Sequence, residues 1–252
     1  MSQSKDPPVI EFRNVSYRID GGAGRELLHD LNLEVQRGET LVLLGRSGSG
    51  KTTTLKLINH LLIPSEGELR VEARPTYEWD AIRLRRMIGY VIQEVGLFPH
   101  FTVERNIGLV PKIENWPANR INERVQELLT LVGLHPEIAS RYPRELSGGQ
   151  RQRVGVARAL AADPPILLMD EPFGALDPIT RAELQREFLG LQQRLRKTVV
   201  FVTHDLREAL LIGTRIALME AGRLVTVQTA EEFPTCAEPL AAAYKNAFGT
   251  GV

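Results

Sequence analysis

The sequence has a single cysteine, no net charge and no long apolar run, and each of these shortages excludes a class of protein. Cys236 is alone among 252 residues, which excludes an intrachain disulfide and a zinc site of paired cysteines, and which suits a reducing compartment. Lys and Arg together number 31, as do Asp and Glu, so the chain has no basic footprint for nucleic acid. It also lacks a run of about 18 apolar residues and a signal-peptide pattern. We therefore expect a chain that neither spans a membrane nor is exported, and that binds no nucleic acid.

The sequence does contain a glycine-rich stretch between a predicted strand and a predicted helix. Gly45–Thr52 reads G-x-x-x-x-G-K-T, the phosphate-binding P-loop pattern. Thr40–Leu44, before it, is a short apolar run suited to a buried strand, and Thr53–Leu62, after it, has apolar residues at helical spacing. Because strand, loop and helix are the context that the pattern requires, a mere glycine-rich turn is the weaker interpretation.

The residue types of this loop fit a nucleoside triphosphate. Glycines lack a Cβ atom, so backbone N–H groups can point at phosphate oxygens, and the following helix adds the positive end of its dipole. Lys51 places a positive charge on the β- and γ-phosphates, and the Thr52 hydroxyl is a hard oxygen ligand suited to Mg²⁺. We expect the loop to bind ATP through Gly45, Arg46, Ser47, Gly48, Ser49, Gly50, Lys51, Thr52 and Thr53.

A second motif follows the predicted strand Ile166–Met169. Asp170 and Glu171 stand directly after this apolar run. In a P-loop NTPase, Asp170 would hold Mg²⁺, directly or through water, and Glu171 would polarise the water that attacks the γ-phosphate. The alternative is a buried strand with two solvated acids at its end. This interpretation is the weaker one because the same chain contains a P-loop.

Strands alternate with helices along the chain, which predicts an α/β fold with a mostly parallel sheet and phosphate bound beyond the carboxyl end of a strand. Between these strands one stretch changes to helix and loop. We expect a single domain with a nucleotide-binding core over 1–92 and 163–228, an inserted helical lobe over 93–162 and a C-terminal tail over 229–252.

Local patterns predict how individual elements bend, begin or turn. The apolar residues of the strand Val9–Ile19 change faces, which a β-bulge near Arg13-Asn14 explains. Asp177-Pro178 is typical of an N-cap followed by proline at the first helical position. Arg215–Met219 and Leu224–Val227 are predicted strands around a turn at the residues between them.

The stretch Leu146–Gln150 reads LSGGQ and is followed by Arg-Gln-Arg. A serine and two glycines at a helix start offer a hydroxyl and N–H groups to a γ-phosphate, whereas the plain alternative is an N-cap followed by a flexible turn. In combination with the P-loop, this stretch resembles the signature of ATP-binding cassette (ABC) ATPases. The resemblance covers nearly the whole chain and implies a P-loop NTPase fold with an N-terminal antiparallel β subdomain and an inserted helical lobe.

Further positions match the family in order, and the resemblance implies a role for each. Tyr17 matches the aromatic that stacks on adenine, although an aromatic on the core face of a strand gives the same pattern. Gln93 matches the Q-loop glutamine that touches Mg²⁺ and the attacking water, and His204 matches the switch histidine on the γ-phosphate. Asp177 matches the D-loop residue that communicates between two cassettes, besides capping its helix. The residues that would bind ATP held by another chain are Ser147, Gly148, Gly149 and Gln150.

The resemblance also implies an activity and partners. It implies an ATPase that works with ATP and Mg²⁺ as a dimer, in which each ATP lies between the P-loop of one chain and the signature of the other. The two chains would be copies of this one or a pair of different cassettes. The cassette would lie on the cytoplasmic face of the membrane, bound to a membrane permease that receives its solute from an extracytoplasmic binding protein.

Within the family, three stretches resemble bacterial importers of quaternary ammonium osmolytes such as glycine betaine, choline, carnitine or proline betaine. These are Gly89–Val103, Ile58–Leu61 and Leu84–Arg86. The chain departs from that group at Arg70–Trp79, which lacks the usual Asp-Gly turn. Many of those cassettes also carry a C-terminal pair of regulatory domains, for which we expect no room here.

Three alternatives remain open. In the first, the chain serves an importer of another solute, such as an amino acid. In the second, the chain is a soluble ABC ATPase that acts on nucleic acid or ribosomes, although such proteins usually have two cassettes or long basic or coiled-coil insertions. In the third, the chain is a nucleotide-regulated scaffold without ATP turnover. Such a scaffold would be expected to lack Glu171 or His204, which are both present.

Overall fold

The computed structural model describes residues 7–19, 24–93 and 95–248, and it forms two compact units. Unit 1 consists of Met1–Arg85 and Lys197–Val252, and unit 2 is Arg86–Arg196. The predicted lobe over 93–162 lies inside unit 2, which also contains two strands and a long helix. The predicted tail over 229–252 belongs to unit 1 and is described as far as residue 248.

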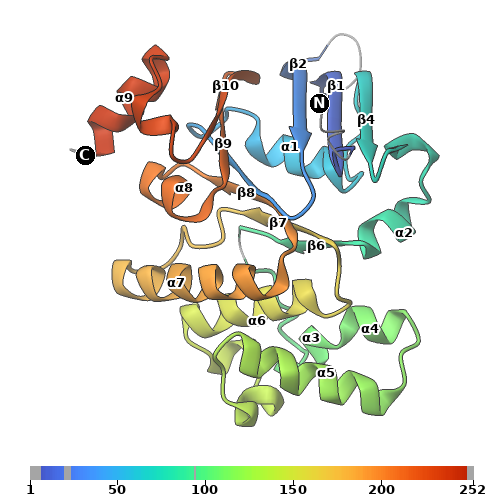
Figure 1. The fold of residues 1–252 in the computed structure, drawn as a ribbon. Coiled ribbons are helices and arrows are strands. Elements are labelled where there is room, and N and C mark those ends of the chain that lie inside the picture. Colours follow the sequence, from blue (N-terminus) through green and yellow to red (C-terminus); the bar gives the residue numbers. More distant parts are fainter. Residues whose placement is uncertain (1–6, 20–23, 94, 249–252) are drawn as a thin grey trace, which may run out of the picture. The chain divides into compact units, whose positions relative to one another are not determined.

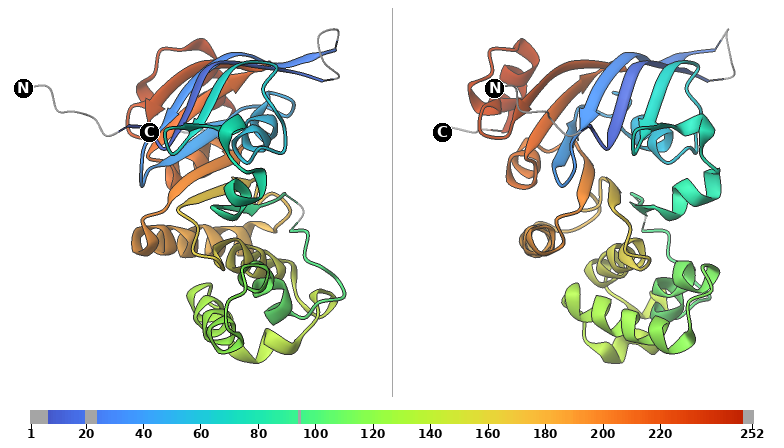
Figure 2. Two further views of the ribbon diagram at one scale, coloured as in Figure 1. Left: turned by 90° about the vertical axis from the view of Figure 1, so that its right-hand side faces the viewer. Right: turned by 45° about the vertical axis from the view of Figure 1, so that its right-hand side comes forward.

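An antiparallel sheet in unit 1 has the strand order β2-β1-β4-β5 (Figure 1 and Figure 2). Its strands are β1 (Ile10–Arg18), β2 (Glu26–Val35), β4 (Glu66–Val71) and the two-residue β5 (Arg74–Pro75). A 3₁₀ turn at Thr76–Glu78 and the short helix α2 (Ala81–Arg86) follow. This sheet confirms the N-terminal antiparallel subdomain.

The bulge predicted near Arg13-Asn14 is confirmed. The β1–β2 register shifts between Phe12 and Val15, and Asn14 has a φ of 50°. β4 passes the bulge through Gly67, whose φ is 81°, and a Cβ atom there would overlap the carbonyl oxygen of Asn14. Only glycine therefore lets β4 approach the bulged strand.

The other strands of unit 1 lie in the order β10-β9-β3-β8. They are β3 (Thr40–Leu44), β8 (Thr198–Thr203), β9 (Arg215–Glu220) and β10 (Arg223–Thr229). β3 is parallel to β8 and to β9, and β10 returns antiparallel after the predicted turn. All five residues of β3 are buried, which fits a strand in the middle of a parallel sheet. The predicted parallel strands are thus confirmed.

Three helices accompany these strands. α1 (Lys51–Ile58) contacts β2, β4 and β8, and α8 (Leu206–Ile212) packs on β3 and β8. A 3₁₀ turn at Phe233–Thr235 leads to α9 (Pro239–Phe248), which packs on α8. Arg207 of α8 donates to the carbonyl oxygen of Phe248 at 2.9 Å.

The helix after the P-loop is shorter than its apolar pattern predicts. The pattern places a helix over Thr53–Leu62, whereas α1 begins at Lys51 and ends before its cap, Asn59. His60 then has a left-handed backbone with a φ of 54°. Arg85 donates to the carbonyl oxygens of Asn59 and His60 at 3.3 and 2.7 Å. The helix ends in a turn closed by its own backbone, in which the N–H of His60 donates to Leu57 and that of Leu61 to Lys56, and Arg85 satisfies the two carbonyls that follow.

Unit 2 contains a parallel strand pair and a group of helices. β6 (Ile88–Val91) pairs with β7 (Ile166–Asp170). The helices are α3 (Val103–Ile107), α4 (Leu109–Ile113), α5 (Ala118–Leu131), α6 (Gly148–Leu160) and α7 (Pro178–Leu195), with 3₁₀ turns at Pro136–Ser140 and Pro143–Glu145. α6 is central because it contacts β6, α3, α5 and α7.

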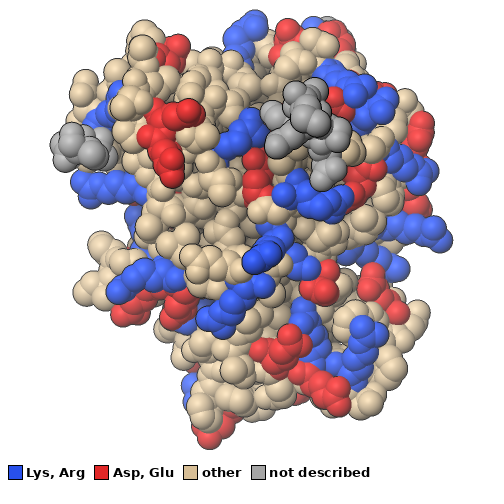
Figure 3. All heavy atoms as spheres, viewed as in Figure 1, with Lys and Arg blue, Asp and Glu red and all other residues tan. Residues whose placement is uncertain are grey.

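Acidic and basic side chains are interspersed over the face drawn in Figure 3. Among the described residues, no helix is both long and apolar enough to cross a membrane.

Two glycine-to-alanine changes should have opposite effects on stability. Gly67→Ala should lower the free energy of unfolding by more than about 1 kcal/mol, because alanine is strained at a φ of 81° and overlaps Asn14. Gly190→Ala should raise it by about 0.5–1 kcal/mol, because Gly190 lies within α7 and a Cβ there meets only Arg194, at 3.8 Å. Urea unfolding of both variants measures the difference, and a neutral Gly67→Ala would contradict the bulge contact.

Candidate nucleotide site

The P-loop joins β3 to α1 with a backbone that requires glycine. Gly48 and Gly50 have φ values of 80° and 100°. At Gly45, a Cβ atom would lie 2.5 Å from the backbone oxygen of Met219 in β9. The spacing of the glycines in the pattern therefore follows from the path of this loop.

The loop holds its lysine in place. Lys51 is buried, and its Nζ donates to the carbonyl oxygens of Gly45 at 2.7 Å and Arg46 at 2.9 Å. The N-cap of α1 is Gly50, which has no side chain with which to cap the first helical turn. A loop of this kind, with an ammonium group and a helix N-terminus at one point, fits the phosphates of a nucleotide.

A cavity of about 310 Å³ opens beside the P-loop, and the sequence did not predict it. It is lined by residues 46–49, by the β9–β10 turn, by Leu240 and Tyr244 of α9, and by Arg25. Arg25 and Arg46 give it two guanidinium groups, and Glu220 gives it one carboxylate. Burial raises the pKa of the Tyr244 phenol, so this wall of the cavity stays neutral.

Two other candidate residues belong to unit 1: His204 directly follows strand β8, and Tyr17 lies within strand β1. His204 is exposed and directly follows Thr203, which pairs with Leu44 in the parallel β3–β8 register. His204 and the P-loop therefore leave the sheet at the same edge. Tyr17 lies opposite Leu28 in the β1–β2 ladder and is half-buried, so its contact with adenine stays a prediction.

Asp170 ends β7 and is 3% exposed. The hydroxyl of Tyr90, in the neighbouring strand β6, donates to Asp170 Oδ2 at 3.4 Å. Burial, together with the Asp170 carboxylate, raises the pKa of Tyr90, so the phenol remains a donor. Sequence reasoning missed Tyr90, and the only signal was a hydroxyl within an apolar strand. Carboxylate and threonine hydroxyl oxygens are hard ligands, so Asp170 and Thr52 are each chemically suited to Mg²⁺.

Glu171 and Gln93 come together within unit 2. The strands β6 and β7 are parallel, so the residues that follow them lie at one edge. Gln93 Nε2 lies 3.5 Å from Glu171 Oε2. Glu171 also has a φ of 44°, a left-handed backbone that is costly for a residue with a side chain. Such strain persists where a side chain must be aimed, as at a reacting centre.

The signature stretch forms the start of α6. Ser147 Oγ accepts from the backbone N–H of Gln150 at 3.2 Å, and Gln150 Oε1 accepts from the backbone N–H of Ser147 at 2.9 Å. This capping box means that the N-cap interpretation is correct, while the helix starts directly at Gly148 without a flexible turn. Ser147 and Gly148 are exposed, so the capping role leaves them accessible to a ligand.

The D-loop aspartate lies beside the signature. Asp177 Oδ1 accepts from the backbone N–H groups of Ile179 and Thr180, each at 3.1 Å. Hydrogen bonds from Thr180 and Ile179 hold the pKa of Asp177 below its usual range. A Cβ atom at Gly149 would lie 2.7 Å from Thr180 Cγ2. The starts of α6 and α7 are therefore packed together at a position that only glycine permits.

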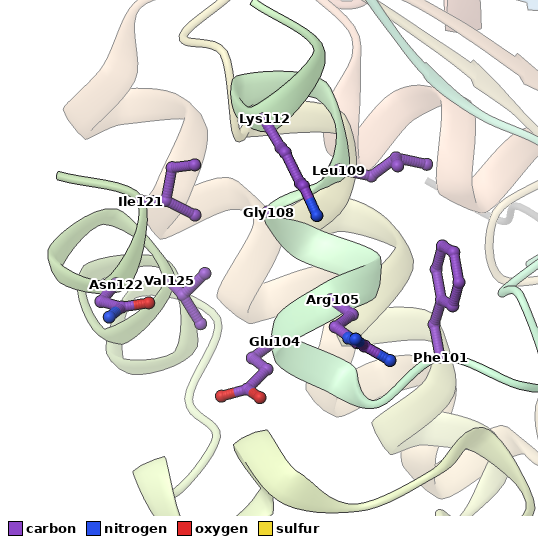
Figure 4. A pocket seen from close by; sticks show the side chains of 9 residues that line it. All are labelled: Phe101, Glu104, Arg105, Gly108, Leu109, Lys112, Ile121, Asn122 and Val125. Carbon is purple, nitrogen blue, oxygen red and sulfur yellow. The ribbon is translucent and has the colours of Figure 1, made fainter. Parts of the chain in front are cut away.

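Unit 2 also has a groove of about 290 Å³ between α3, α4 and α5, which the sequence did not single out (Figure 4). Gly108 is part of the lining and lies close to α5, because a Cβ atom there would be 2.8 Å from Ile121 Cγ2. Glu104, Arg105 and Lys112 supply its charges. The apolar part of the lining is Phe101, Leu109, Ile121 and Val125.

Comparison with known proteins places these features in a family. The family model described as ABC transporter matches residues 28–174, more than half of the chain. The chain is 51% identical over 224 residues to the choline transport ATP-binding protein OpuBA of Bacillus subtilis and 54% identical over 224 residues to its glycine betaine/carnitine/choline counterpart OpuCA. Both alignments cover 89% of this chain and 58% of the relative, so the chain spans less than two thirds of those proteins. The glycine betaine uptake protein YehX of Escherichia coli is 50% identical over 217 residues, covering 86% of this chain and 70% of YehX.

Solved structures agree in fold. The cassette MJ0796, solved as a dimer bound to ADP and Pi, has a TM-score of 0.79 and 34% identity over 88% of this chain and 98% of that one. CbiO1 of Clostridium perfringens has a TM-score of 0.83 and 26% identity, over 94% and 95% of the two chains. The predicted ABC ATPase fold is confirmed, and the chain belongs to the ABC transporter family.

Proposed function

We propose that this chain binds and hydrolyses ATP as the cassette of an importer for quaternary ammonium osmolytes. The observation that carries the solute class is the identity of about half of all residues with proteins named for choline, carnitine and glycine betaine transport. The observation that supports hydrolysis is the strained Glu171 with the Gln93 amide at its carboxylate.

The roles follow from the chemistry of each side chain. The P-loop N–H groups and Lys51 bind the phosphates, and Tyr17 stacks on adenine. Thr52, Asp170 and Gln93 would hold Mg²⁺, which would supply positive charge to neutralise the phosphates. Glu171 takes the proton of the attacking water as a general base. His204 binds the γ-phosphate.

Two copies of the chain form the working ATPase in this proposal. Ser147, Gly148, Gly149 and Gln150 of one copy complete the phosphate contacts of the ATP held by the other, and Asp177 lies at the same junction. The MJ0796 cassette, which is similar to this chain, forms a dimer, and this supports the arrangement. Loss of the γ-phosphate removes contacts on both sides and loosens the pair.

The permease partner is proposed to dock on the groove between α3, α4 and α5. Its apolar walls with three charged residues suit the end of an amphipathic helix. The cassette would then act at the cytoplasmic face of the membrane, and the permease would take its solute from an extracytoplasmic binding protein. Importers of other solutes, such as amino acids, remain the second candidate because their cassettes share the same ATP chemistry.

Glu171→Gln should slow hydrolysis by about a hundredfold or more, the scale of losing a general base, while ATP binding persists. The matched control is Glu183→Gln, which removes the same charge from an exposed position on α7. Steady-state phosphate release measures both. Wild-type turnover in Glu171→Gln would overturn the assignment of the base.

The solute and the partner are tested together in proteoliposomes that contain the cassette, its permease and its binding protein. Glycine betaine or choline should stimulate ATP hydrolysis, and amino acids should not. Lys112→Glu in the groove should abolish that stimulation by reversing a charge at the docking surface. The control is Arg83→Glu, an exposed position on α2. Stimulation by amino acids alone would favour the second candidate, and full stimulation of Lys112→Glu would refute the docking surface.

A further inference from the structure

Arg158 of α6 binds the backbone just beyond Gln93. Its NH1 donates to the carbonyl oxygen of Gly96 at 2.7 Å, and its NH2 donates to that of Val95 at 2.8 Å. The planar guanidinium thus binds two successive carbonyls through two of its nitrogens, whereas a lysine would have to reach both through a single nitrogen. Burial lowers the pKa of Arg158, so the two carbonyls replace part of the lost hydration. The two bonds fix the backbone orientation of this dipeptide.

A second contact fixes the same dipeptide. Gly155 lies one turn before Arg158 on α6, and a Cβ atom there would lie 2.7 Å from Val95 Cγ1. The backbone of α6 therefore touches the Val95 side chain directly. Because Gly155 and Arg158 are three residues apart, they lie on one face of the helix. That face is in contact with the segment after Gln93.

The other end of α6 is the signature. The capping box of Ser147 and Gln150 makes this end regular, so the helix is a stiff rod about 16 Å long between Ser147 and Arg158. Gln93, which precedes the dipeptide Val95-Gly96 in the chain, has its Nε2 atom 3.5 Å from Glu171 Oε2. One helix thus contacts residues 95 and 96, close in the chain to Gln93, and begins at the residue that would act on the ATP of another chain.

We infer that Arg158 is a positioning residue that fixes the segment after Gln93 to the helix that begins at Ser147. This inference rests on the proposed function, in which Gln93 serves the ATP of its own chain and Ser147 serves that of its partner. Val95 and Gly96, which follow Gln93 closely in the chain, then move with α6. Engagement of Ser147 in one site sets the position of Gln93 in the other, and the two sites of the dimer are coupled.

The test variant is Arg158→Met, which removes the guanidinium group and keeps an unbranched apolar side chain. The Hill coefficient for ATP hydrolysis should fall from about 2 to about 1 as the sites become independent. Arg158→Lys, which keeps the charge but not the guanidinium group, should give an intermediate Hill coefficient. It serves as the test variant if Arg158→Met does not fold. ATP affinity of the single chain should not change, because Arg158 touches no proposed ATP-binding residue in any contact described above.

The matched control is Arg153→Met on the same helix. Arg153 donates to the carbonyl oxygen of Val132 at 2.8 Å and pairs with Glu187, so it links α6 to other helices and not to residues 95–96. Its removal should lower stability and keep the Hill coefficient. Amide hydrogen exchange of residues 95–98 should rise in Arg158→Met and not in Arg153→Met.

A wild-type Hill coefficient in a folded Arg158→Met would overturn the inference, as would unchanged exchange at residues 95–98. Absence of ATP hydrolysis in the wild type would count instead against the proposed function, whereas absence of cooperativity in the wild type would overturn the coupling of the two sites. The exchange measurement needs no turnover, so in that case it still decides whether Arg158 holds the segment.

Discussion

The backbone N–H groups in the first turn of an α-helix have no acceptor within the helix, and this constraint organises the candidate site. The chain meets it in different ways. At α7 and α8 an aspartate caps the helix, Asp177 and Asp205 respectively, and a negative charge there repels phosphate. At α1 the cap is Gly50, which has no side chain, and at α6 it is the neutral Ser147. Both helix starts that the family motifs mark thus lack a negatively charged cap, a property they share with α3, α4 and α5.

The motifs could be predicted because their signals are local. Glycines with positive φ determine the backbone path of the P-loop within a few residues, and Ser147 and Asp177 are residue types typical of the N-caps that they form at α6 and α7. The β-bulge followed from a change of parity along a single strand. The predicted end of α1 was wrong because the chain turns at His60 with a left-handed backbone, and Arg85, 25 residues beyond it, binds the carbonyl oxygens of Asn59 and His60.

The remaining parts of the site depend on contacts between elements that are distant in sequence. Tyr90 reaches Asp170 across 80 residues, and Arg158 reaches Gly96 across 62. The close approach of Gly149 to Thr180 is likewise invisible in the LSGGQ pattern, where glycine is equally explained by ligand binding. Packing of this kind is set by the fold as a whole, so a single sequence does not reveal which polar or small residue serves it.

The central claim is that a complete ATP site needs residues from two copies of the chain. Mixing two inactive variants tests it most directly, one with Lys51→Ala in the P-loop and one with Ser147→Arg in the signature. In a mixed dimer, the intact P-loop of one copy faces the intact signature of the other. Random pairing should therefore restore up to about a quarter of wild-type ATP hydrolysis, the value for independent sites, since about half of the dimers are mixed and each has one working site. Recovery of no activity from dimers shown to be mixed, or wild-type activity of the Ser147→Arg variant alone, would contradict the account.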